Sequence, residues 1–222
     1  MTSSHPMSGE PTADLTLLPA GARALITLGH GAGSPMTSPL LGGFCDAMAA
    51  RGIGTHRFNF PYMAAGRRAP DRAPVLIDAY RHAHARAAEL AGGLPLFAGG
   101  RSMGGRIASM AVADGMPAAA LVFLAYPLHP PGRPDRIRDE HLYGISVPML
   151  FIQGTRDAFA QPQLLHAVLG RLGDRAELVE VEGADHGFRR AGGERDAARI
   201  GASLAEHATA FVDRVLAGGG DG

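Results

Sequence analysis

The sequence predicts an α/β fold in which a mostly parallel sheet carries helices on both faces. Short apolar runs that resemble buried strands alternate along the chain with longer segments of helical periodicity. The chain has 222 residues, 46% of them hydrophobic, which suffices for one well-buried domain and is short for two. We therefore expect a single domain over residues 14–217, flanked by flexible tails at 1–13 and 218–222.

The expected elements follow one another as strand and helix through the whole domain. Strands are expected at residues 23–28, 55–60, 94–98, 120–125, 148–152 and 176–181, with an edge strand at 14–18. Helices are expected at residues 39–51, 74–91, 103–114, 161–171 and 195–216. Parallel sheets of this kind place their functional sites at the carboxyl ends of the strands.

The first long strand is followed by a glycine-rich turn, His30-Gly31-Ala32-Gly33. Glycines in such a turn let a backbone N–H approach a developing oxyanion. The N–H of Ala32 is the expected donor, with Gly31 or Gly33 as the alternative. His30 is expected to brace the turn through a side-chain hydrogen bond.

A serine stands at the apex of the next strand, turn and helix. Residues 100–104 read Gly-Arg-Ser-Met-Gly, directly after the strand at 94–98 and before the helix at 103–114. A serine at such a turn adopts a positive φ, and the flanking glycines prevent a Cβ clash. The pattern predicts Ser102 as a nucleophile and the N–H of Met103 as an oxyanion donor.

An acid and a histidine follow the last two strands in the order that this arrangement requires. A serine needs a base to take its proton, and the base needs an orienting carboxylate. Asp157 comes just after the strand at 148–152, and His186 just after the strand at 176–181. Asp185 is expected to be a surface or loop-bracing residue instead of the triad acid, because the side chains of adjacent residues point in different directions. The sequence therefore predicts a triad of Ser102, Asp157 and His186.

The segment 127–147 is too short and too rich in proline for a cap domain. Four prolines between residues 127 and 134 prevent a long helix in its first half, and one short helix is expected later. The pocket should therefore be open or covered only by a loop. His129 is expected either to reach this pocket or to be exposed.

These motifs together resemble a known group of proteins. Gly99–Gly105, His30–Gly33, Tyr126–Gly132 and Gln153–Asp157 are similar to segments of small capless α/β-hydrolase-like proteins of bacteria, which are related to a subunit of the nonspecific-lethal acetyltransferase complex of animals. More distantly, the chain is similar to dienelactone hydrolases. The resemblance implies an α/β-hydrolase fold without a cap domain and the same triad.

The expected function is that of a serine hydrolase that cleaves an ester, thioester or lactone through an acyl-enzyme. The alternative is a catalytically idle α/β-hydrolase fold that serves as an interaction module. Neither a cofactor nor a metal is expected. The oligomeric state stays open.

The loops that follow the strands contain more arginines than acidic residues. One interpretation is a solvated surface, since every basic residue of this chain is arginine. The other is an anionic small-molecule ester, bound through its carboxylate or phosphate by Arg101 and Arg190. Arg190 follows His186 closely, and this resembles the arginine that dienelactone hydrolases carry soon after their histidine.

The overall composition points to no charged partner. The formal net charge is zero, so nothing demands nucleic acid or a charged membrane. No signal peptide and no membrane-spanning stretch are evident, so a cytoplasmic protein is expected. The one cysteine, Cys45, is expected to be a buried thiol on a helix.

Overall fold

A computed structural model describes residues 14–218 and contains one seven-stranded sheet. The order of the strands across the sheet is β1-β3-β2-β4-β5-β6-β7. Only β1 is antiparallel to its neighbour, and the other strands pair in parallel. The strands are β1 (Leu15–Leu17), β2 (Ala24–Gly29), β3 (Ile53–Arg57), β4 (Leu96–Arg101), β5 (Leu121–Leu124), β6 (Met149–Gly154) and β7 (Ala176–Val181). The predicted α/β class and its mostly parallel sheet are confirmed.

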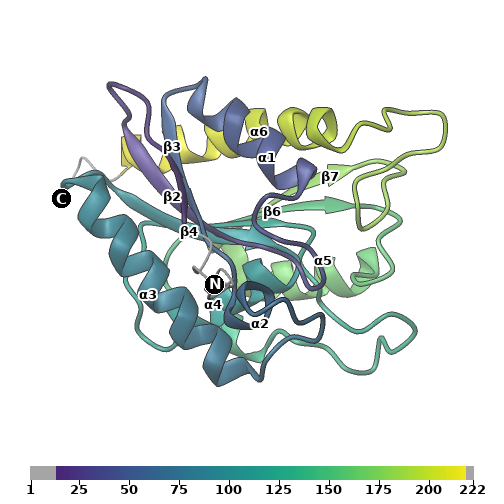
Figure 1. Ribbon diagram of the computed structural model, residues 1–222. Helices are drawn as coiled ribbons and strands as arrows, with labels where there is room; N and C mark the ends of the chain where they lie inside the picture. The colour runs from purple at the N-terminus through teal and green to yellow at the C-terminus, as the bar shows by residue number, and fades with distance from the viewer. Residues whose placement is uncertain (1–13, 219–222) are drawn as a thin grey trace, which may run out of the picture.

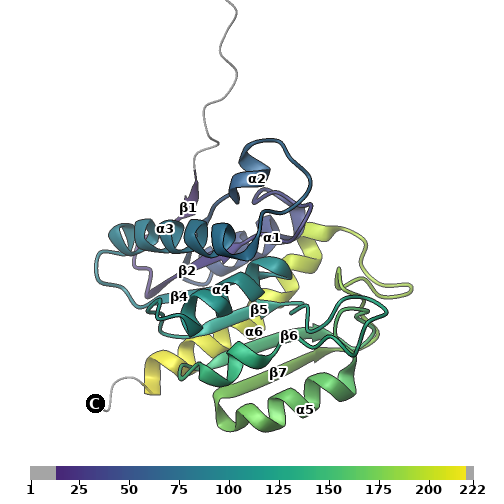
Figure 2. The same ribbon diagram turned by 90° about the horizontal axis from the view of Figure 1, so that it is seen from below.

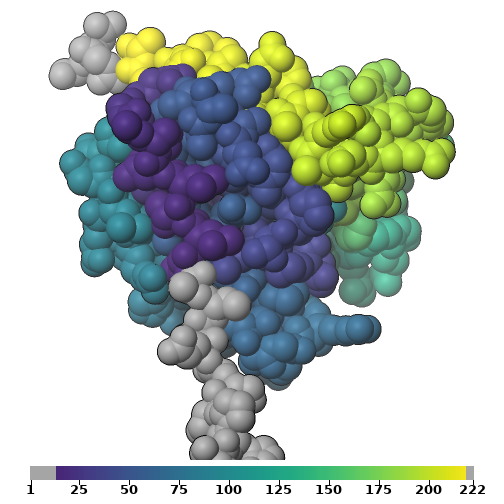
Figure 3. Space-filling model, turned by 45° about the horizontal axis from the view of Figure 1, so that its top comes forward, coloured from purple at the N-terminus to yellow at the C-terminus, as the bar shows by residue number. Residues whose placement is uncertain are grey.

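Helices cover both faces of the sheet, as Figure 1 shows. They are α1 (Pro39–Ala49), α2 (Pro61–Ala64), α3 (Ala73–Ala91), α4 (Met103–Ala113), α5 (Pro162–Leu172) and α6 (Ala197–Gly218), with short 3-10 helices η1 (Glu140–Gly144) and η2 (Gly173–Arg175). On one face, α1 and α6 pack side by side (Figure 3) through Phe44 and Phe211. On the other face, α3, α4 and α5 (Figure 2) bury Tyr80, Ile107 and Leu165. The central strands β2, β3, β5 and β6 are therefore buried between two apolar layers.

The sequence marks the ends of several helices. Proline stands in the first turn of α1, α2, α3 and α5, where its missing N–H leaves no intrahelical bond unmade. At the other end, α3 stops at Gly92 in the left-handed conformation. Cys45 lies buried on α1, as predicted.

Some predicted boundaries were wrong. The strand expected at residues 55–60 is β3, Ile53–Arg57, and the aromatic residues that follow it form no strand. Phe58 and Phe60 are nevertheless buried against the α3 and α4 side of the core, and Phe60 caps the short helix α2. These hydrophobic side chains therefore pack a loop against the core and do not belong to a strand. Of the tails expected at 1–13 and 218–222, residues 1–13 and 219–222 lie outside the described residues. Gly218, which was expected in the second tail, belongs to α6.

The segment between β5 and β6 contains only the helix η1, so no cap domain covers the sheet. The predicted absence of a cap and the predicted short helix after Pro134 are both confirmed. Within residues 14–218, no helix combines the length and the apolar character needed to cross a bilayer.

Candidate active site

Ser102 lies at the junction between β4 and α4 with a strained backbone. Its φ is 50° and its ψ is −117°, a left-handed conformation that costs a residue with a Cβ atom free energy. Helix α4 turns back directly against β2, because a Cβ atom at Gly104 would lie 2.1 Å from the carbonyl oxygen of Gly29. This close crossing holds Ser102 at the carboxyl edge of the sheet, where the predicted turn places it.

The structure joins Ser102, His186 and Asp157 in one chain of hydrogen bonds. His186 Nε2 lies 2.8 Å from Ser102 Oγ, and His186 Nδ1 lies 2.7 Å from Asp157 Oδ2. The Asp157 carboxylate is buried, and it follows β6, while His186 follows β7. In this arrangement the imidazole donates its Nδ1–H to the carboxylate and can accept the serine proton at Nε2. Loops from three strands thus assemble the three predicted residues.

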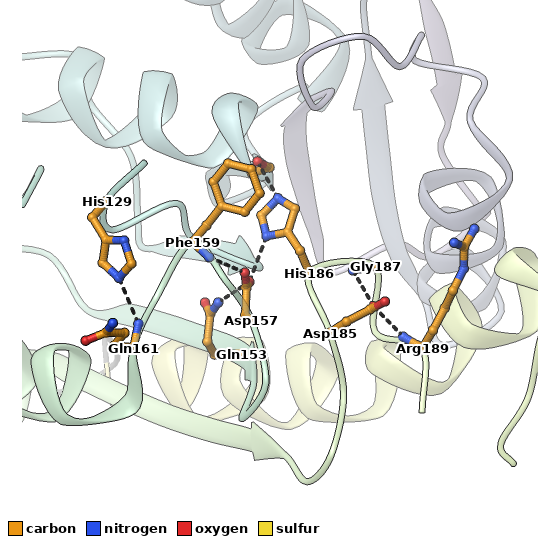
Figure 4. A network of polar contacts seen from close by, with 10 residues as sticks. His129, Gln153, Asp157, Phe159, Gln161, Asp185, His186, Gly187 and Arg189 are labelled. Atoms are coloured by element: carbon orange, nitrogen blue, oxygen red, sulfur yellow. Dashed lines mark hydrogen bonds and ion pairs between the residues drawn. The ribbon is translucent and has the colours of Figure 1, made fainter. Parts of the chain in front are cut away.

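Two further residues, which the sequence analysis missed, hold Asp157 and His186. The side-chain amide of Gln153 donates to Asp157 Oδ2 at 2.6 Å, and the backbone N–H of Phe159 donates to Oδ1 at 2.8 Å. The ring of Phe159 stacks on the His186 ring with centroids 4.1 Å apart. Figure 4 shows Asp157 between Gln153 and His186. The Phe159 bond is an aspartate turn that the two-residue spacing could have suggested, whereas Gln153 has no comparable signal.

The glycine-rich turn after β2 is braced by His30, as predicted. His30 Nδ1 donates to the Gly31 carbonyl at 2.9 Å, and Nε2 accepts the backbone N–H of Phe60 at 3.0 Å. Burial lowers the pKa of His30, which favours this neutral form. The turn lies against the nucleophile, because a Cβ atom at Gly31 would be 3.7 Å from the Cβ atom of Ser102.

The two predicted oxyanion donors start from suitable backbone positions. Met103 is the first residue of α4, so its N–H has no acceptor within the helix and lies at the positive end of the helix dipole. Ala32 is exposed in the turn braced by His30. Gly31 and Gly33 stay the alternatives to Ala32, and the assignment stays a prediction.

His129 requires a correction. The sequence analysis expected this side chain to contact the pocket or to be exposed. Instead it is buried, its Nδ1 donates to the Pro130 carbonyl at 2.9 Å, and its Nε2 accepts the N–H of Gln161 at 3.0 Å. The Nδ1 atom therefore braces the loop after β5 itself, and the Nε2 atom ties this loop to the residue before α5. His129 is a structural brace without a free nitrogen for a substrate.

Arg190, which was predicted to bind the substrate, is exposed on the loop that follows His186. Arg190 lines a cavity of about 270 Å³ together with Arg156, Arg189 and Asp185. Asp185 points away from the His186 ring (Figure 4), and its Oδ1 accepts the N–H groups of Gly187 and Arg189 at 2.8 and 2.9 Å. It therefore braces the loop, as predicted.

Arg101 lies on the other side of Ser102 in the sequence and is half-buried at the end of β4. Its Nε is buried and has no hydrogen-bond partner. Burial lowers the pKa of its guanidinium, and the charge of Asp157 opposes this effect. A role of Arg101 and Arg190 in binding substrate stays a prediction.

Another cavity lies far from these residues. It has a volume of about 910 Å³ and is lined by residues such as His84, Leu96 and Met116, at the amino ends of β4 and β5. Ser102 lies at the carboxyl end of β4, so this cavity opens at the opposite edge of the sheet. Side-chain chemistry, and not cavity volume, identifies the candidate site.

Solved structures share this fold over most of their length. An α-β serine hydrolase homologue from Coxiella burnetii matches with a TM-score of 0.70 and 17% identity, covering 89% of this chain and 90% of that one. A dienelactone hydrolase from Anabaena variabilis matches with a TM-score of 0.69 and 20% identity, over 90% of both chains. A serine hydrolase without a lid from Xanthomonas campestris matches with a TM-score of 0.65 and 20% identity, over 90% of this chain and 94% of that one.

The α/β hydrolase domain model matches residues 22–213, which include the glycine-rich turn, the serine turn and the loops with Asp157 and His186. The match therefore spans every element that positions the candidate site. This chain belongs to the α/β hydrolase family.

Proposed function

We propose that this protein is a serine hydrolase that cleaves carboxylic esters, thioesters or lactones through an acyl-enzyme. The observation that supports the proposal best is the hydrogen-bonded chain from Ser102 through His186 to the buried Asp157. The strained backbone at Ser102 is a second support, because such strain is characteristic of functional positions. The family membership and the names of the similar structures agree with a hydrolase.

In the proposed mechanism, Ser102 Oγ attacks the carbonyl carbon while His186 Nε2 takes its proton. Asp157 orients the imidazole and stabilises the imidazolium that forms. The N–H groups of Met103 and Ala32 stabilise the oxyanion of the tetrahedral intermediate. His186 then gives its proton to the leaving oxygen or sulfur, and a water molecule, activated by the same histidine, releases the acid from Ser102.

The proposed substrate is a small soluble ester, because no cap domain encloses an apolar acyl pocket above Ser102. The similar dienelactone hydrolase suggests that a lactone is a suitable form of this substrate. An anionic ester is a further proposal, with Arg101 and Arg190 as candidate partners of its carboxylate or phosphate. A cytoplasmic location and a kinship with the nonspecific-lethal complex subunit stay predictions of the sequence.

The alternative is an idle hydrolase fold that serves as an interaction module. The intact side-chain geometry argues against it, since an idle copy has no chemical need for Gln153 and Phe159 to hold Asp157. Measured hydrolysis of an ester distinguishes the serine hydrolase from the interaction module.

The first prediction is that Ser102→Ala abolishes hydrolysis of short 4-nitrophenyl esters. Loss of a triad nucleophile removes on the order of a millionfold in kcat, so the remaining activity should be near background. Ser146→Ala is the matched control, because Ser146 is exposed and lies just before β6, at the edge of the sheet opposite to Ser102. Unchanged turnover in Ser102→Ala would contradict the proposed nucleophile and would favour the interaction module.

A further inference from the structure

Three arginine side chains in the described part of the chain are half-buried and make no hydrogen bond or ion pair: Arg101, Arg106 and Arg138. The other arginines with comparable burial all have partners, namely Arg57 with Met36, Arg81 with Asp114, and Arg175 with Ile145. A guanidinium that is withdrawn from water without a partner is costly, so an anionic partner is expected. In Arg101 and Arg106 the Nε atom is buried and has no hydrogen-bond partner.

Arg106 and Arg138 are held near one another by a polar network between α4 and the loop after β5. The Ser109 hydroxyl donates to the Arg106 carbonyl and contacts His141 Nε2, both at 2.8 Å. The Tyr126 hydroxyl donates to the Arg138 carbonyl at 2.9 Å and lies 3.4 Å from the same His141 nitrogen. One histidine thus joins the two backbone segments that carry the arginines. The backbone positions of both arginines are therefore fixed by half-buried and buried side chains.

No neighbouring acid forms an ion pair with either guanidinium among the described residues. Burial first, and then the charge of Arg106, lowers the pKa of Arg138. His141 adds no charge at neutral pH, because burial lowers its pKa to about 4. Asp139 is engaged elsewhere, since it accepts the Tyr143 hydroxyl at 2.5 Å and lies 3.7 Å from Arg171.

Arg106 lies one helical turn after the nucleophile on α4. The N–H of Arg106 donates to the Ser102 carbonyl at 3.1 Å, so the two residues are one helical turn apart, about 6 Å along the axis. Long side chains on a helix lean toward its N-terminus, which brings the Arg106 guanidinium closer to the level of Ser102. A group bound there would lie within a few carbon atoms of the proposed reaction centre.

We propose that Arg106 and Arg138 form a binding site for the oxyanion group, carboxylate or phosphate, of a small molecule. Two guanidinium forks match the oxygen atoms of such a group and donate charge-assisted hydrogen bonds to it. The site is distinct from the Arg101 and Arg190 positions named above. The anionic group is carried either by the ester substrate, in which case the inference rests on the proposed function, or by a free anion that binds beside it.

Direct binding tests the site without any catalysis. Inorganic phosphate and glutarate are titrated into the wild-type protein, and binding is measured by calorimetry and by the rise in Tm. We expect binding that weakens with salt and falls about tenfold or more in Arg106→Gln and in Arg138→Gln. Arg106→Lys keeps the charge and should retain part of the affinity. Arg136→Gln is the matched control, because Arg136 is exposed on the same loop.

Kinetics distinguish the two sources of the anion. The ratio of kcat/KM for mono(4-nitrophenyl) glutarate to that for 4-nitrophenyl valerate should fall about tenfold in both Gln variants if the substrate carries the anion. If this ratio is unchanged in the Gln variants while phosphate binding is lost in both, the site binds a free anion. Binding and ratio that are both unaffected by these substitutions would overturn the site. Labelling of Ser102 by a fluorophosphonate reports the proposed function separately.

Discussion

At the scale of single residues, Ser102 carries a strain of about 1–3 kcal/mol that its neighbours hold in place. Its N–H donates to the Leu124 carbonyl of β5 at 2.9 Å, and its own carbonyl accepts the N–H of Arg106 at 3.1 Å. The backbone on both sides of the serine is therefore fixed before any substrate binds. This preorganisation keeps the hydroxyl within hydrogen-bonding distance of His186.

Gln153 gives the sharpest prediction at this scale. Its amide donates to the same Asp157 oxygen that accepts the His186 bond, so it fixes the rotamer of the carboxylate. In Gln153→Leu we expect kcat/KM for a short ester to fall about 10- to 100-fold, because a displaced carboxylate misplaces the imidazole. The loss should appear mainly in kcat, since Gln153 is buried and contacts Asp157 instead of the substrate.

Gln161→Leu is the control for this experiment. Gln161 is an exposed residue at the start of α5, and its bond to His129 uses the backbone N–H, which the substitution keeps. Steady-state kinetics and circular dichroism are compared for both variants. Full activity in a folded Gln153→Leu protein would show that Asp157 needs no such support.

At the scale of elements, the crossing of β2 and α4 decides where the nucleophile stands. Gly104→Ala should destabilise the protein by about 1–3 kcal/mol or more, because the new methyl group would lie 2.1 Å from the Gly29 carbonyl oxygen. It should also lower kcat, since relief of this clash moves the first turn of α4 and with it Met103 and Ser102.

Gly170→Ala provides the opposite case within the same molecule. Gly170 lies inside α5, and no atom is within 4 Å of the position of an added Cβ atom. We expect this variant to be about 0.5–1 kcal/mol more stable, with unchanged activity. Urea denaturation of both variants measures the difference. Equal stability of the two variants would mean that the β2–α4 crossing tolerates a wider separation than the structure shows.

At the scale of the whole molecule, burial of histidines makes stability depend on pH. Burial lowers the pKa of His30, His56, His84 and His141 below the ordinary value of about 6.5. Below that pH the unfolded chain binds protons that the folded protein does not, so stability falls as the pH falls. The stabilisation is complete above about pH 6.5 and is lost progressively toward the lowered pKa of each group.

His141 allows this prediction to be measured, since its pKa is lowered to about 4. Between pH 6.5 and 4.5 it should contribute a slope of about 1.4 kcal/mol per pH unit at most to the free energy of unfolding. In His141→Gln that part of the slope should disappear, whereas the exposed His207→Gln should keep the wild-type slope. An identical slope in His141→Gln and the wild type would show that His141 is charged in the folded protein.

The sequence predicted the parts of the molecule that depend on local chemistry. A strand, a glycine-flanked turn and a helix placed Ser102 correctly, and the order of strand ends located Asp157 and His186. Contacts that depend on how a loop bends or on how segments pack in space could not be predicted. Gln153 reaches Asp157 only because β6 and its loop bend together, and His129 is buried by backbone groups from residues 130 and 161.

The same limit applies to surfaces and boundaries. Phe58 and Phe60 have the composition of a strand, but the chain leaves the sheet after Arg57 and buries them under α3. The sequence also does not show which arginines lack an acidic partner, because that depends on the tertiary structure. Arg106 and Arg138 are 32 residues apart and cannot be told from surface arginines in the sequence. Counting charges in the loops therefore showed an excess of arginine but could not identify an anion-binding site.

Labelling with a fluorophosphonate probe, followed by peptide mapping, is the most direct test of whether Ser102 is an activated nucleophile. The probe reacts with a serine only when a base activates it and donors stabilise the oxyanion, so it reports the assembled site without knowledge of the substrate. We expect stoichiometric labelling of Ser102 in the wild type, strongly reduced labelling in His186→Ala, and no labelling in Ser102→Ala. Absence of labelling in the folded wild-type protein, or labelling of another serine, would contradict the assignment of Ser102 as an activated nucleophile.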